Sequence, residues 1–451
     1  MRRVLPSLLC LACGAILTLV TIVPRVQGAE PTADPSSQAD FERTVADSIR
    51  ELDAPTRARR ETAMRQLRDF GPRVLPLLPA PELLPTASVR DAVVQLRGEL
   101  ERRQALLSIK PSTVTLRGTK SLTAWLQEVT VRTGNRFDLS ALAAKVANRT
   151  EKLDLIDTEF WSAIDHLLIQ SNLQLGNSST SAGVKLEPRT KRESPAVVST
   201  VGAFRFAAGA AQFRPIAGTA DRRIIRVPIS IFPEPRLRPL FLHYANSEIE
   251  ARTSTGTLIP SFSPDAKYEI PLGEGGLRVS LQLDFVAPTN TDLTKISLSG
   301  KFWMTTAANQ EPIRIAGLKS LQGPRSRAIA RRRGGVTVTA RRVTLPAPEA
   351  RDRELRVEAA VTYDNGGPAF ESHRTWILHN LVYLESPDKQ RFQLNGGFDT
   401  RLQEDGTVVL EYRFTDVPNP LPDYAFVYVA PTLIVDAPLE FRLNSIPIEN
   451  P

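Results

Sequence analysis

The chain has 451 residues, of which 42% are hydrophobic and 24% are charged. This composition is ordinary for a folded protein and excludes a chain that is disordered throughout, and the length predicts about three domains. The formal net charge of +8 is mild for a chain of this size and does not by itself predict a polyanionic partner.

Residues 1–28 have the order of an export signal. Two arginines precede an apolar run over residues 4–23, and the small residues of "VQGA" follow it. We therefore expect a signal peptide that is cleaved after Gly28 or Ala29, and a mature protein that is periplasmic or secreted. An uncleaved N-terminal anchor is the alternative, because 20 largely apolar residues are just long enough to span a bilayer. We expect no membrane span after cleavage.

Both cysteines, Cys10 and Cys13, lie inside this signal. Cleavage leaves a mature chain without a thiol, and such a chain has no disulfide, no thiolate metal site and no cysteine nucleophile. Cleavage also removes three arginines and no acid, so the net charge falls from +8 to +5. We expect no nucleic-acid partner for an exported chain, and an anionic wall polymer is the electrostatic target in its compartment.

Residues 29–40, which begin "AEPTADPSSQ", are predicted to be a disordered leader. Residues 41–106 are predicted to form two or three short helices, because apolar residues recur near helical spacing. The strings "RRETAMRQLRDFGPRVLPLL" and "ASVRDAVVQLRGELERR" resemble a HEAT-type helical repeat. The resemblance covers at most one and a half repeats, whereas a solenoid needs about three, so we expect this segment to pack on its neighbour.

Residues 107–188 follow the order strand, helix, strand twice. "STVTLRG", an apolar helix face and "NRFDL" make the first half, and "EKLDLID", "FWSAIDHLL" and "NLQLG" make the second. We expect a small α+β sandwich with helices on one side of a sheet. The second helix is expected to be capped by Asp157 or Thr158 and to end before Asn172. The strings "VTL", "LTAWLQEVTVRTGN" and "FWSAIDHLL" resemble the short N-terminal domain of secretins and TonB-dependent receptors.

The stretch "FWSAIDHLL" carries a hydroxyl, a carboxylate and an imidazole at Ser162, Asp165 and His166. Its apolar residues fall on one helix face: Phe160, Ala163, Ile164, Leu167 and Leu168. The three polar residues lie on the other side. Asp165 and His166 are adjacent and do not face each other, so the carboxylate cannot orient the imidazole as a catalytic triad requires. We therefore predict a core helix and no catalytic site.

The rest of the chain is predicted to be all-β. Apolar and polar residues alternate over 277–285, 355–363 and 408–414, which is typical of antiparallel strands with one buried face. Turn dipeptides such as Asn365-Gly366, Asn395-Gly396 and Asp405-Gly406 separate such runs.

We infer two antiparallel, Ig-like β-sandwich domains at residues 189–318 and 334–451, each near the roughly 100 residues that such a domain uses. A basic linker over residues 319–333, which includes most of "GPRSRAIARRRGG", is predicted to join them. Residues 325–342 contain seven arginines and no acid. We expect this stretch to be a solvated spacer, and the alternative is a surface that grips an anionic wall polymer or lipid headgroups.

Other candidate chemistry is sparse. The four histidines are His166, His243, His373 and His379. The last two share one face of a predicted strand but lie roughly 20 Å apart, which is too far for one metal ion. Two acidic pairs flank predicted turns and are expected to be caps or solvated: Asp154 with Asp157, and Glu404 with Asp405. The sequence predicts no catalytic, cofactor-binding or metal-ligating residue and no cofactor.

The mature chain as a whole resembles a group of exported planctomycete-type proteins of unknown function. The residues that carry this resemblance are the HEAT-like start, "EFWSAIDHL", "GAFRF", "IFPEPRLRPL", "ESHRTWILHNLVYL" and "LEFRLNSIPIENP". The chain departs from the group where it has "VGAF" in place of a Gly-Pro-Phe. The resemblance implies the architecture and an envelope location, and it implies no activity.

We therefore expect a non-enzymatic, exported cell-envelope protein that acts through protein–protein contacts. The second hypothesis is a protein that binds carbohydrate or wall polymer, and the third is an unrecognised hydrolase. Exposed coplanar aromatics in a groove would favour the second, and a deep pocket with facing carboxylates would favour the third. Four aromatic residues in predicted strands are expected to be core residues: Trp303, Trp376, Tyr383 and Tyr428.

The order of basic, apolar and small residues in the leader predicts a mature N-terminus at Ala29 or Glu30. Mass measurement of the protein isolated from its native envelope checks this. A chain that still began at Met1 would instead establish the uncleaved anchor.

Overall fold

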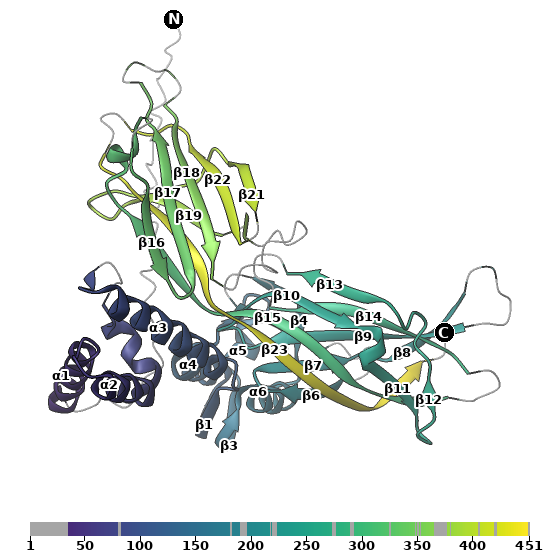
Figure 1. The fold of residues 1–451 in the computed structure, drawn as a ribbon. Helices are drawn as coiled ribbons and strands as arrows, with labels where there is room; N and C mark the ends of the chain where they lie inside the picture. The colour runs from purple at the N-terminus through teal and green to yellow at the C-terminus, as the bar shows by residue number, and fades with distance from the viewer. Residues whose placement is uncertain are drawn as a thin grey trace, which may run out of the picture.

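The computed structural model describes residues 35–79, 83–180, 183–189, 196–216, 218, 223–272, 277–288, 293–323, 326–347, 349, 351, 353–364, 377–378, 380–404, 406–418 and 422–449. Helices come first and several sheets follow, and strands predominate (Figure 1). The predicted mainly β class with an N-terminal helical segment is confirmed at this level. The predicted signal at residues 1–28 lies outside the described residues.

The helical segment consists of α1 (Pro35–Glu51), α2 (Arg57–Phe70), the 3-10 helix η1 (Gly71–Leu77) and α3 (Ala87–Ser108). Residues 35–40 of the predicted disordered leader are therefore helical. A proline suits the first position of a helix, because that position needs no N–H and the fixed φ of proline is already helical. Arg68 of α2 donates to both carboxylate oxygens of Glu99 on α3, at 2.6 and 3.0 Å. No helix in the described ranges is both long and apolar enough to cross a membrane.

The next part of the chain, which we call the α+β module, alternates strands and helices. Its elements are β1 (Thr113–Ser121), α4 (Leu122–Thr133), β2 (Phe137–Asp138), α5 (Ala144–Ala147), β3 (Thr150–Glu159), α6 (Phe160–Gln170), β4 (Leu173–Thr180) and β5 (Gly183–Pro188). The predicted order of strand, helix, strand, repeated once, is confirmed.

The expected placement of both helices on one side of a single sheet is wrong. β1 pairs with β3 in a two-stranded sheet, whereas β2, β5 and β4 form a separate three-stranded sheet. The buried sides of α4 and α6 share one apolar core with both sheets. α6 can pack against both sheets because its buried residues cover a wide arc of the helix surface. These residues are Phe160, Trp161, Ala163, Ile164, Leu167 and Leu168.

The N-terminal boundary of α6 also differs from the prediction. β3 continues to Glu159 in register with β1, so Asp157 and Thr158 are strand residues and neither caps the helix. The first N–H of the helix, that of Phe160, donates to the Ser112 carbonyl at 2.7 Å. The helix ends at Gln170, which confirms the predicted end before Asn172.

The first sandwich follows the α+β module. Its strands are β6 (Val197–Val201), β7 (Phe204–Ala208), β8 (Ala211–Pro215), β9 (Arg223–Pro233), β10 (Arg238–Ala245), β11 (Ile249–Thr253), β12 (Leu258–Ile259), β13 (Lys267–Pro271), β14 (Val279–Val286), the first part of β15 (Lys295–Ile315) and the last part of β23 (Ala425–Glu449). The 3-10 helix η3 (Asn246–Glu248) joins β10 to β11. One apolar core lies between β7, β9 and β14 on one side and β10, β11 and β15 on the other.

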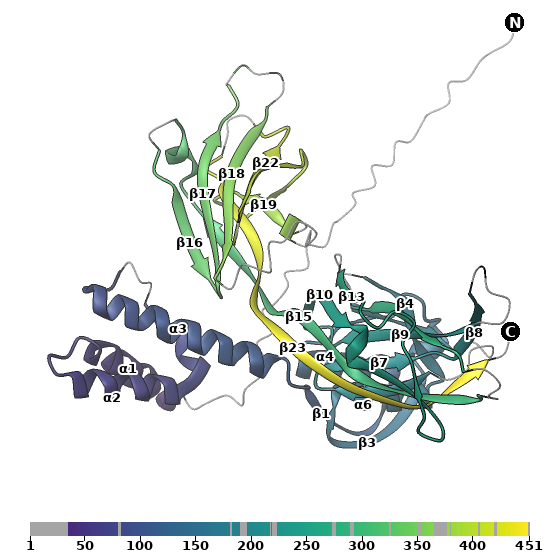
Figure 2. The same cartoon turned by 45° about the vertical axis from the view of Figure 1, so that its right-hand side comes forward.

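The second sandwich contains β16 (Ile329–Arg333), β17 (Val336–Thr344), β18 (Leu355–Tyr363), β19 (Val382–Glu385), β20 (Arg391–Gln393), β21 (Phe398–Glu404) and β22 (Thr407–Phe414), with η4 (Leu318–Leu321) before them. β16, β17, β18, β22 and β21 form one sheet, and the upper parts of β15 and β23 face it. Figures 1 and 2 show β15 and β23 running from one sandwich into the other.

The shared strands correct the predicted boundaries of both sandwiches. β15 and β23 pair antiparallel from Lys295 opposite Pro447 to Ile315 opposite Phe426. The C-terminal part of β23 packs in the first core, although the sequence assigned all of residues 334–451 to the second sandwich. Alternation along one strand cannot reveal which distant strand it joins, because pairing depends on residues more than 100 positions away.

The predicted basic linker over residues 319–333 is also corrected, because residues 329–333 form β16 and pair with β17. Gly334 and Gly335 make the two-residue turn between these strands, with φ of 49° and 80°. Two residues with positive φ match the right-handed twist of a hairpin, and glycine adopts them without strain. A Cβ at Gly334 would also lie 2.6 Å from Cβ of Thr432 on β23.

A buried polar cluster joins the helical segment, the α+β module and the first sandwich. Glu234, between β9 and β10, has no exposed surface. Its carboxylate accepts hydrogen bonds from the backbone N–H of Ser112 at 2.8 Å and from Asn135 Nδ2 at 3.0 Å. Arg236 donates to the same carboxylate at 2.6 Å and to the carbonyl of Ser108, at the end of α3, at 2.5 Å.

The burial pattern of α6 predicts which substitutions destabilise the module. Ile164→Ala and Leu167→Ala each remove a buried side chain and should each lower the free energy of unfolding by about 2 to 5 kcal/mol. Ser162→Ala and His166→Ala change exposed positions and should cost less than about 0.5 kcal/mol. Chemical denaturation of the four variants checks the prediction, which fails if the polar substitutions are as costly as the apolar ones.

The cluster around Glu234 predicts that removal of this one carboxylate strongly lowers the free energy of unfolding. Glu234→Ala leaves Arg236 without its buried partner and should lower the free energy of unfolding by about 3 to 5 kcal/mol. The control is Glu250→Ala, which removes a carboxylate 2.9 Å from Arg252 in an exposed pair and should cost less than about 1 kcal/mol. Equal costs in denaturant titrations would refute the assigned role of Glu234.

Candidate functional site

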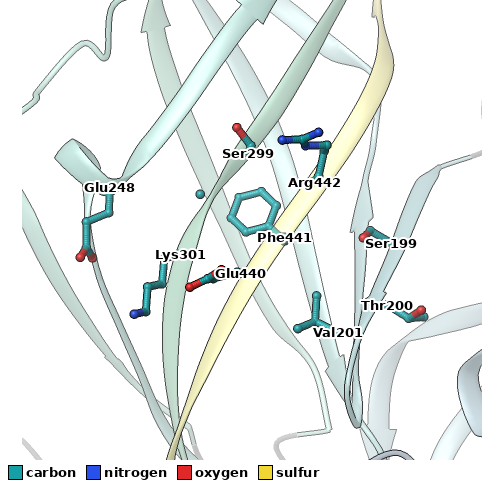
Figure 3. Close-up of a pocket in the computed structure, with 10 residues that line it drawn as sticks. Ser199, Thr200, Val201, Glu248, Ser299, Lys301, Glu440, Phe441 and Arg442 are labelled. Carbon is teal, nitrogen blue, oxygen red and sulfur yellow. The ribbon is translucent and has the colours of Figure 1, made fainter.

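The strongest candidate for a site is an open groove of about 510 Å³ where β6, η3, β15 and β23 meet. We call it the β15–β23 groove. Lys301 of β15 lies opposite Glu440 of β23, and Ser299 lies opposite Arg442. Figure 3 shows these four side chains across the two strands, with Glu248 on one side. The groove therefore combines two bases, two carboxylates and hydroxyl groups.

Gly300 allows the walls of the groove to come together. A Cβ at this residue would lie 2.7 Å from the carbonyl oxygen of Glu248 and 2.9 Å from Cα of Ile249. Any larger residue would push η3 and the start of β11 away from β15. Because Gly300 keeps η3 close, the Glu248 side chain can line the groove.

An aromatic pair continues the same face of β15 beyond Lys301. The rings of Trp303 and His243, on neighbouring strands, are parallel within 5° with centroids 6.0 Å apart. The Lys301 ammonium lies 4.2 Å from the centre of the Trp303 ring. A sugar that stacked on Trp303 would compete with this cation–π contact. Trp303 is half-buried and lies on the outer face of the sheet, so the expectation of a core residue is wrong for it.

The two carboxylates of the groove do not have the environment of a glycosidase pair. Glu248 and Glu440 are both exposed. A general acid of that kind needs a raised pKa, which comes from burial in an apolar pocket. The groove is open, and Lys301 lies directly opposite Glu440. The arrangement suits reversible binding of a polar ligand better than acid–base catalysis.

The three polar residues of α6 have different surroundings. Ser162 and His166 are exposed. Asp165 instead faces Arg205 of β7, whose Nε donates to both carboxylate oxygens at 2.9 Å. Sequence reasoning missed this pair, because the two residues are 40 positions apart and nothing in either local pattern links them.

The other predicted residues have varied placements. His373, His379 and Trp376 lie outside the described residues, as does Asp405. The carboxylate of Asp154 pairs with Arg117 at 3.3 Å in an exposed contact. Tyr383 and Tyr428 are core residues, as predicted. Burial raises the pKa of the Tyr428 hydroxyl, which accepts a hydrogen bond from Asn380 at 2.6 Å.

A second open groove, also of about 510 Å³, runs between α1 and α2. Small side chains such as Ser48 and Ala63 line it together with charged residues. Arg59 of α2 pairs with Glu51 of α1 at 2.8 Å across the groove. Both side chains are largely accessible to solvent, so the pair contributes little to stability.

The groove residues Lys301, Glu440 and Arg442 were not candidates from the sequence. The available signal was polar residues at alternate positions within "SGKFW" and "LEFRL", but the outer face of any antiparallel strand has the same pattern. Within the described ranges, no three His, Cys, Asp or Glu side chains come together as metal ligands would. A scan against protein-family models found no match, and no curated protein matches the chain.

Proposed function

We propose that this protein is a non-enzymatic, exported cell-envelope protein that acts through protein–protein contacts. The observation that carries the proposal is the placement of its most buried ion pairs at contacts between parts of the fold. Asp165 with Arg205 and Glu101 with Arg332 each join two parts. Glu234 and Arg236 lie in one loop, and this pair hydrogen-bonds to Ser112 and Asn135 of the α+β module and to Ser108 of α3. In an acid–base enzyme, buried charges are typically gathered around a pocket, where their shifted pKa values serve chemistry. Here they fix the relative positions of several surfaces.

The finer identities of the parts belong to the same proposal. The repeated order of strand, helix and strand in residues 113–180 supports a relation to the short N-terminal domain of secretins and TonB-dependent receptors. The α1–α2 hairpin followed by α3 supports a HEAT-like segment, and the two sheet pairs support Ig-like sandwiches. The likeness to exported planctomycete-type proteins, together with the leader, supports a periplasmic or secreted location.

Carbohydrate or wall-polymer binding is the second candidate, and one observation favours it. The β15–β23 groove offers hydroxyl, carboxylate and cationic groups beside Trp303, and sugars are bound by such polar groups next to an aromatic ring. The contact of Lys301 with Trp303 counts against it. A hydrolase is less well supported, because the carboxylates of the groove are exposed.

Retention of envelope components on the immobilised mature protein tests the proposal. If protein contacts mediate retention, digestion of the envelope extract with protease should abolish it, and digestion with glycosidases should leave it unchanged. The opposite result would establish the carbohydrate candidate. In that case Trp303→Ala should also weaken binding to isolated wall polymer, whereas Tyr268→Ala, at an exposed aromatic on β13, should not.

A further inference from the structure

Strand β16 combines an open edge with arginines that lack ion-pair partners. It is the terminal strand of its sheet, and among the described strands its backbone pairs only with β17. Arg331 and Arg333 are exposed, and no ion pair of either is found among the described residues. Arg341 and Arg342, at the bulge of neighbouring β17, are exposed as well. Two exposed arginines of the basic stretch thus lie on the edge strand, and two more lie on the strand beside it.

Arg332 holds this strand in place. It donates to Glu101 of α3 at 2.9 Å and also contacts Asp364. Burial lowers the pKa of the Arg332 guanidinium, but its hydrogen bonds to Glu101 and Asp364 outweigh burial and raise that pKa. A charged, hydrogen-bonded guanidinium in a partly buried position gives β16 a fixed orientation, so the edge is ordered before any partner arrives.

Among the described residues, no strand pairs with β16 on the side away from β17. In Figures 1 and 2, β16 lies at the border of its sheet, and α3 lies near one end of it. β15, of the facing layer, lies close to β16 but does not pair with it. An open strand edge presents unpaired N–H and C=O groups, which can pair with another chain.

We propose that the free edge of β16 binds an extended acidic segment of a partner protein by strand addition. Arg331 and Arg333 are two residues apart, so they point to the same side and lie about 7 Å apart. An added strand with acidic residues at alternate positions has the same spacing, and each carboxylate would lie opposite one guanidinium. This inference rests on the proposed function and names the chemistry of the partner.

The observations favour a peptide over another polyanion. Guanidinium groups would attract any anionic polymer, but a strand edge adds main-chain hydrogen bonds that only a polypeptide can match residue by residue. Charged side chains also protect strand edges against aggregation, which is the competing explanation for these arginines. The two explanations differ in whether an acidic strand binds.

The test uses the full mature protein and a fluorescent ten-residue peptide that alternates glutamate and valine. Fluorescence anisotropy at physiological salt should show binding that weakens at least about tenfold in the variant Arg331→Gln/Arg333→Gln. The matched control, Arg90→Gln/Arg102→Gln, removes two exposed arginines from α3 and should bind as the unmodified protein does. Absence of binding, or equal loss in both variants, would overturn the proposal.

Backbone methylation separates strand addition from simple charge attraction. Alternate N–H groups of an added strand point toward β16 and away from it, so methylating one alternate set should abolish binding and methylating the other should not. If both methylated peptides bound equally and heparin competed equally well, the site would bind polyanions in general. That result would refute strand addition.

The envelope retention experiment keeps this inference separate from the proposed function. If retention is lost with protease treatment but Arg331→Gln/Arg333→Gln retains as much as the unmodified protein, the β16 site is refuted and the proposed function stands. If retention by the unmodified protein does not depend on protein in the extract, the proposed function is refuted.

Discussion

The arrangement of this protein depends on one buried carboxylate. Glu234 accepts hydrogen bonds from residues that begin the α+β module and follow its first helix, and Arg236 beside it binds the end of α3. A buried ion is stable only when its hydrogen-bonding capacity is used, so the segments that supply its partners must converge there. A loop between two strands of the first sandwich thereby fixes where the helical segment and the module lie.

The ribbon of β15 and β23 imposes the second constraint, because it belongs to both cores. On β15, Phe302 and Met304 face the first core, whereas Ile313 and Ile315 face the second. Successive side chains of a strand point to opposite faces, so even-numbered and odd-numbered residues of β15 lie on opposite faces of the ribbon. The two sandwiches therefore pack on opposite faces of shared strands. α3 packs against both strands, and Glu101 links it to β16.

Local patterns predicted most elements and few of the contacts between them. The alternation over 355–363 matches β18, and the apolar arc of "FWSAIDHLL" matches α6, because both depend on the period of a single element. The return of β23 to the first core and the pairing of Asp165 with Arg205 depend on long-range register, which a single sequence does not encode locally. The Gly-Gly turn before β17 was a usable local signal, and the basic residues around it led to the prediction of a linker instead.

The distribution of charge connects this architecture to its use. Two arginines at boundaries between parts have carboxylate partners across the boundary: Arg205 pairs with Asp165, and Arg332 pairs with Glu101. An arginine at the surface without such a partner does not hold two parts of the fold together, and water hydrates it at little cost in free energy. Arg331 and Arg333 flank Arg332 on the same strand. Arg332 therefore links β16 to another part of the fold, and its two neighbours do not. That contrast is expected where a rigid strand is held by one residue and presents its neighbours to a partner.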